Sequence, residues 1–76
     1  MRKTTSDIKE RCAEELHRVF CDYINLAHRC GFNIKQVYPW WYAETIPSAV
    51  SMRVLDQFGV DIYYIITGKR MVKTDV

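Results

Sequence analysis

The first apolar pattern in the chain has helical spacing, with positions separated by three or four residues: Ile8, Cys12, Leu16, and Val19 or Phe20. Charged residues fill the remaining faces of this segment. Asp7 precedes the pattern and, with Glu10, has the spacing of a capping box. We therefore predict an amphipathic helix over about residues 7–20.

Two further short helices are predicted on either side of Gly31. Asp22 can cap a helix that runs from Tyr23 to Arg29 or Cys30. Gly31 suits the left-handed position that ends a helix without a Cβ penalty. Asn33 can cap the next helix, which begins at Ile34.

Pro39 falls inside this third predicted helix. It has no N–H for the carbonyl of Lys35, and it disfavours helical geometry at Tyr38. The helix, with Val37 turned inward, is therefore expected to kink at Pro39, or to stop and restart through residues 40–42.

Two closing helices are predicted, at residues 49–58 after Ser48 and at residues 62–66 after Asp61. Glycine follows each, at positions 59 and 68. The first of them takes its apolar spacing from Val50 or Met52, Leu55 and Phe58. Five helices with short connections predict an all-α fold, with a flexible basic arm at 1–6, one domain at 7–68 and a basic tail at 69–76.

The composition supports one small helical domain. The chain has 76 residues, of which 49% are hydrophobic, and only three are Gly and two Pro, which argues against an all-β fold. The formal net charge of +2 permits nucleic-acid binding without indicating it. There is no apolar run of membrane-spanning length and no secretion signal, so we expect a cytoplasmic protein.

The chemistry-bearing residues indicate no catalytic or metal site. Cys12, Cys21 and Cys30 are nine residues apart, which matches no zinc pattern, so reduced and mostly buried thiols are expected. His17 falls on the polar side of the first helix and is expected to be solvated. There is no carboxylate pair, nucleophile–base set or phosphate-binding glycine loop, so neither an enzyme nor a cofactor is expected.

Three segments carry a family resemblance: Leu26-Ala27-x-x-Cys30-Gly31-Phe32; Val37 and Trp40 followed by Ile46-Pro47; and the closing run GVDIYYIITG at 59–68. On these the chain resembles the lambda-repressor-like helix-turn-helix domains, and more narrowly the DNA-binding domains of phage lysogeny repressors. The resemblance covers about residues 7–70. It implies a compact five-helix fold in which the third helix reads DNA.

The resemblance also implies DNA-binding roles for six residues. Those expected at base edges are Asn33, Ile34, Lys35 and Tyr38, with Gln36 near a phosphate or base and Tyr23 near the DNA backbone. Lys35 can donate to guanine, Gln36 or Asn33 can pair with adenine, and Ile34 can cover a thymine methyl.

The expected function is that of a sequence-specific transcriptional regulator, a repressor of phage or prophage type. A homodimer would bind a near-palindromic double-stranded DNA operator through the major groove. Its dimer contacts would come from the fifth helix, the tail or the aromatic cluster, and the fifth helix is a plausible choice. The alternative is a protein-interaction module on the same fold, such as an antirepressor or a host-factor inhibitor. Its partner would bind exposed aromatics, namely Tyr38, Trp41 and Tyr42.

Overall fold

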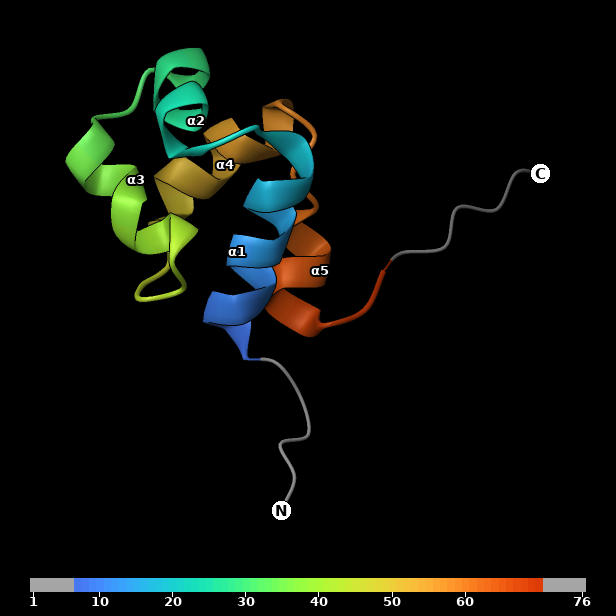
Figure 1. The fold of residues 1–76 in the computed structure, drawn as a ribbon. Coiled ribbons are helices and arrows are strands. Elements are labelled where there is room, and N and C mark those ends of the chain that lie inside the picture. The colour runs from blue at the N-terminus through green and yellow to red at the C-terminus, as the bar shows by residue number, and fades with distance from the viewer. Residues whose placement is uncertain (1–6, 71–76) are drawn as a thin grey trace.

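The computed structural model describes residues 7–70, which contain five α-helices and no strand (Figure 1). The helices are α1 Ile8–Val19, α2 Tyr23–Cys30, α3 Ile34–Trp41, α4 Ala49–Gln57 and α5 Ile62–Thr67. The all-α prediction is confirmed. The predicted arm at 1–6 and residues 71–76 of the predicted tail lie outside the described residues.

A polar side chain caps the N-terminus of every described helix. In each case its oxygen accepts a hydrogen bond from a backbone N–H of the first turn: Asp7, Asp22, Asn33, Ser48 and Asp61. These N–H groups have no partner within their own helix, so each cap satisfies a donor that would otherwise need water. The predicted caps are therefore confirmed.

Four of the chain reversals between residues 7 and 70 use a residue with positive φ. Three are glycines, at positions 31, 59 and 68, and the fourth is Ala43, with φ of 61°. At Ala43 the N–H of Glu44 donates to the carbonyl of Pro39 at 2.8 Å, and the N–H of Ala43 donates to the carbonyl of Trp40 at 3.3 Å. This pair of bonds is a Schellman motif, which ends α3 with alanine in the position that glycine usually occupies.

Pro39 lies inside α3, which continues to Trp41. The helix therefore does not stop and restart at the proline. Val37 and Trp40 on its inner face are 0% and 4% exposed. Their burial and the bonds that close α3 after Tyr42 hold the helix together although Pro39 donates no backbone hydrogen bond.

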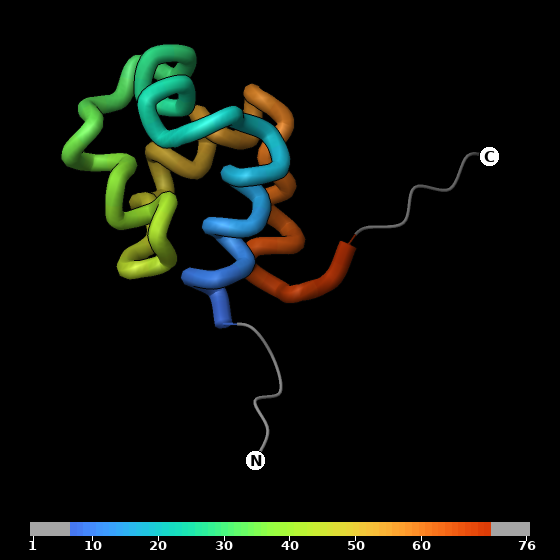
Figure 2. Tube along the Cα trace, in the orientation of Figure 1, coloured from blue at the N-terminus to red at the C-terminus, as the bar shows by residue number. Residues whose placement is uncertain are grey.

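α1 is the central element of the fold. In Figures 1 and 2, α3 lies on one side of α1 and α5 on the other, and α1 packs against both. The core contains the buried side chains Cys12, Leu16, Phe20, Leu26, Ala27, Val37, Trp40, Met52, Leu55, Val60 and Ile65. Of the two alternatives predicted for the apolar face of α4, Met52 is buried, whereas Val50 is 71% exposed.

The side chain of Cys21 is exposed, whereas its thiol was expected to be buried. Cys12 is buried, and burial together with the negative charge of Glu15 raises the pKa of its thiol to about 12. None of the helices within residues 7–70 is long and apolar enough to cross a membrane.

Candidate nucleic-acid interface

The connection between α2 and α3 is short and fixed at both ends. Gly31 adopts φ of 78°, and the N–H groups of Gly31 and Phe32 both donate to the carbonyl of Ala27 at 2.9 Å. Asn33 then begins α3. Because both ends of this turn are hydrogen-bonded, the direction of α3 relative to α2 is set by backbone geometry as well as by packing.

Asn33 and Gln36 form a capping box at the start of α3. The side-chain oxygen of Asn33 accepts from the N–H of Lys35 at 2.8 Å, and that of Gln36 accepts from the N–H of Asn33 at 3.4 Å. A two-bond contact with adenine needs both the oxygen and the nitrogen of the amide. In this conformation each side chain has its NH₂ group left to donate outward, while its oxygen is used within the turn.

The six predicted site residues divide by exposure. Five of them are exposed, at the start and outer face of α3: Asn33, Ile34, Lys35, Gln36 and Tyr38. The sixth, Tyr23, is half-buried at the start of α2. Lys35 is the basic residue of α3.

Three tyrosines meet at one side of this surface. The ring centroids of Tyr23 and Tyr38 are 5.2 Å apart, those of Tyr38 and Tyr42 4.8 Å, and those of Tyr23 and Tyr42 6.2 Å. Tyr38 and Tyr42 are 45% and 52% exposed. The three rings pack on one another edge-on or tilted. Because Tyr23 begins α2 and the other two lie in the second half of α3 and at its end, this tyrosine cluster joins the two helices.

Trp41 was expected to be exposed, and that prediction is wrong. The side chain is half-buried and packs against the core. The ring of His17 lies 4.2 Å from it, centroid to centroid, and Nε2 of His17 is 3.0 Å from the Trp41 carbonyl oxygen. The exposed histidine thus ties α1 to the end of α3, which removes Trp41 from the set of free interface aromatics.

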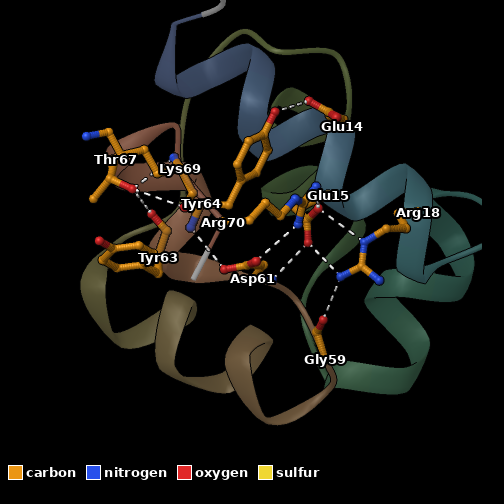
Figure 3. A network of polar contacts seen from close by, with 10 residues as sticks. All are labelled: Glu14, Glu15, Arg18, Gly59, Asp61, Tyr63, Tyr64, Thr67, Lys69 and Arg70. Carbon is orange, nitrogen blue, oxygen red and sulfur yellow. Dashed lines mark hydrogen bonds and ion pairs between the residues drawn. The ribbon is translucent and has the colours of Figure 1, made fainter. Parts of the chain in front are cut away.

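A buried carboxylate, Glu15 of α1, faces Arg18, Asp61 and Arg70 (Figure 3). Its oxygens accept from Nε and Nη2 of Arg18 at 3.1 and 2.7 Å, and from Nη2 of Arg70 at 2.8 Å. They also accept from the backbone N–H of Asp61 at 2.9 Å. Burial would raise the pKa of Glu15, but the hydrogen bonds from Arg18, Asp61 and Arg70 outweigh it and hold the pKa at about 2.

Sequence reasoning did not find this Glu15 network. The available signal was position: Glu15 follows Ile8 by seven residues and Cys12 by three, so it falls on the apolar stripe of α1. A carboxylate there requires partners, and Arg18 is one turn further along. The other two partners come from the end of the chain and had no local signature.

Four arginines make contacts with other groups of the same chain. Arg18 and Arg70 bind Glu15, and Nε of Arg11 donates to the carbonyl of Ile65 at 3.0 Å. The guanidinium of Arg29 lies 5.2 Å from the ring centroid of Phe20, a cation–π contact. None of these four arginines lies on α3, where the positive charge is that of Lys35.

Comparisons with protein-family models, with curated proteins and with solved structures found no match to this chain.

Proposed function

We propose that the chain is a sequence-specific DNA-binding transcriptional regulator, a repressor of phage or prophage type with a lambda-repressor-like helix-turn-helix fold. The observation that supports this most is the short, hydrogen-bonded turn before α3 together with the exposed residues that follow it. A helix presented in this way can enter the major groove while its inner face stays in the core.

The proposed chemistry assigns different roles along this surface. Lys35 donates to the O6 and N7 acceptors of guanine, and Ile34 covers a thymine methyl. Asn33 and Gln36 donate through their NH₂ groups to base or phosphate acceptors. Tyr23 lies beside the sugar–phosphate backbone and positions the helix without reading sequence, whereas Tyr38 faces a base edge.

Selection from random duplexes tests the proposal. A homodimer should select a near-palindrome whose half-sites are about one helical turn apart. Lys35→Ala should relax the selected sequence at one position in each half-site. The affinity of the native chain for the selected duplex should fall steeply as salt rises, because binding releases counterions from the DNA backbone. Lys9→Ala removes a positive charge at an exposed position of α1 and is the matched control for Lys35→Ala. Failure to enrich any duplex would reject this function.

The tyrosine cluster favours a second candidate, a protein-interaction module that acts as an antirepressor or host-factor inhibitor. Tyrosines are common interface anchors, and two acidic residues, Asp22 and Glu44, lie close to the cluster in sequence. Such a surface suits a partner with basic side chains. A stoichiometric complex lost on Tyr42→Ala, with no duplex selected, would support this function. Tyr63→Ala on α5 is its control.

A further inference from the structure

The capping box at the start of α3 fixes which atoms of its two amide side chains face outward. A backbone N–H is a donor, so only the oxygen of an amide can satisfy it. The oxygen of Asn33 is held by the N–H of Lys35 at 2.8 Å, and that of Gln36 by the N–H of Asn33 at 3.4 Å. Both amides therefore meet an external partner with their NH₂ groups.

The backbone that carries this capping box is fixed to the core. The carbonyl of Asn33 accepts from the N–H groups of Gln36 and Val37 at 2.9 and 3.2 Å, and Val37 is 0% exposed. Phe32, directly before the cap, packs edge-on against the buried Trp40, with ring centroids 5.2 Å apart. The two amides therefore extend from a backbone that cannot shift without disturbing buried side chains.

The other two side chains of this turn offer no acceptor either. Lys35 ends in an ammonium group, which only donates, and Ile34 has no polar atom in its side chain. All four residues are exposed, and we call them the donor surface of α3: Asn33, Ile34, Lys35 and Gln36. A base that drew an amide oxygen out of the capping box would leave a backbone N–H without a partner in a contact that excludes water.

We propose that the donor surface of α3 selects guanine and rejects adenine at the base pair that Gln36 contacts. In the major groove guanine presents two acceptors, O6 and N7, whereas adenine presents the acceptor N7 beside the donor N6. An amide pairs with adenine through both its oxygen and its nitrogen, and the oxygen of Gln36 is used within the turn. This preference rests on the proposed function, and it replaces the adenine contact that was expected from the sequence.

Two substitutions of Gln36 separate the outward donor from the capping oxygen. Gln36→Glu keeps an oxygen for the N–H of Asn33 but has no NH₂ group, whereas Gln36→Lys keeps an outward donor but has no oxygen. In selection from random duplexes, the native full chain and Gln36→Lys should both give guanine at one position of each half-site. Gln36→Glu should give cytosine there, because the N4 amino group donates to a carboxylate, and should bind the guanine duplex at least about tenfold more weakly.

Thermal unfolding of the same variants tests the capping box without DNA. Gln36→Lys should lower the unfolding midpoint by about 4 °C, because the N–H of Asn33 loses its acceptor. Gln36→Glu should not lower it, since its carboxylate still accepts from this N–H and is favoured near a helix N-terminus. Gln57→Glu makes the same chemical change at an exposed position of α4 and should select the same duplex as the native chain.

The outcomes separate this base preference from the proposed function. Selection by the native chain of adenine, or of any base but guanine, at the position that Gln36→Glu alters would overturn the preference and leave the proposed function standing. The same holds if Gln36→Glu selects the native duplex, or if Gln36→Glu and Gln36→Lys unfold at the same midpoint. If the native chain enriches no duplex, the proposed function is rejected and the preference with it.

Discussion

Ala43 has a backbone conformation that glycine adopts at three other helix ends of this chain. An L-residue in the left-handed region is strained by about 1–2 kcal/mol, because its Cβ approaches the neighbouring carbonyl. We predict that Ala43→Gly raises the free energy of unfolding by about 0.5–1 kcal/mol, after the larger unfolded-state entropy of glycine is subtracted. Urea denaturation measures this change.

Gly59→Ala makes the opposite substitution at another residue with positive φ, and it serves as the control for Ala43→Gly. Gly59 has φ of 99°, and a Cβ built there meets no atom within 4 Å, so the substitution adds backbone strain alone. It should lower the free energy of unfolding by about 1 kcal/mol. If Ala43→Gly also lowered it, the Schellman closure of α3 would not be strained at Ala43.

Glu15 makes stability depend on pH in the acid range. Its pKa is lowered from 4.5 to about 2 in the folded state, so its stabilisation is fully present above pH 4.5. It is lost progressively as pH falls from 4.5 towards 2. A depression of this size corresponds to about 3 kcal/mol. Glu15→Gln should flatten the acid limb of the stability profile, measured by urea denaturation from pH 2 to 6.

Glu44→Gln is the matched control for Glu15, since Glu44 is an exposed carboxylate outside the network. Glu15→Gln should also lower stability at pH 7 by about 2–3 kcal/mol, because Arg18 and Arg70 lose their ionic partner. An unchanged acid limb in Glu15→Gln would mean that another carboxylate governs acid unfolding.

At the scale of elements, helix boundaries followed from local chemistry. Asp22, Asn33 and Asp61 cap their helices through bonds that span two or three residues, so the sequence alone predicted them. The continuity of α3 through Pro39 was not predictable in that way. It depends on the burial of Trp40, a tertiary effect that overrides propensity, and on the local closure at Ala43, where alanine takes a position that usually requires glycine.

Side chains held by distant partners were the least predictable part of the candidate site. Trp41 is half-buried because His17 of α1 packs on it, across 24 residues of sequence. Glu15 is tolerated in the core because Asp61 and Arg70 reach it from the end of the chain. Neither contact leaves a local pattern that periodicity or spacing could detect.

The tyrosine cluster should couple α2 and α3 energetically. We predict that Tyr23→Ala and Tyr38→Ala are non-additive, with a coupling energy of about 0.5–1.5 kcal/mol in a double-mutant cycle on unfolding free energy. Tyr38 with Tyr63 on α5 is the control pair, and should be additive within about 0.5 kcal/mol. Additive effects for Tyr23 and Tyr38 would show that their ring contact contributes little to stability.

At the scale of the whole molecule, α1 fixes α3 and α5 relative to each other. His17 contacts the Trp41 carbonyl at the end of α3, whereas Arg11 contacts the Ile65 carbonyl and Glu15 the N–H of Asp61 at α5. In a two-fold dimer that makes its contacts through α5, this relation fixes the separation of the two copies of α3.

A fixed separation predicts a dependence on operator spacing. Inserting about 5 base pairs between the half-sites turns one of them by about half a helical turn, out of reach of the second α3. The native chain should lose at least about tenfold in affinity for the lengthened operator, because only one copy can then bind. Equal binding of the two operators by the native chain would show that the copies do not bind as a rigid two-fold dimer. Gel-shift titrations on the two duplexes measure the difference.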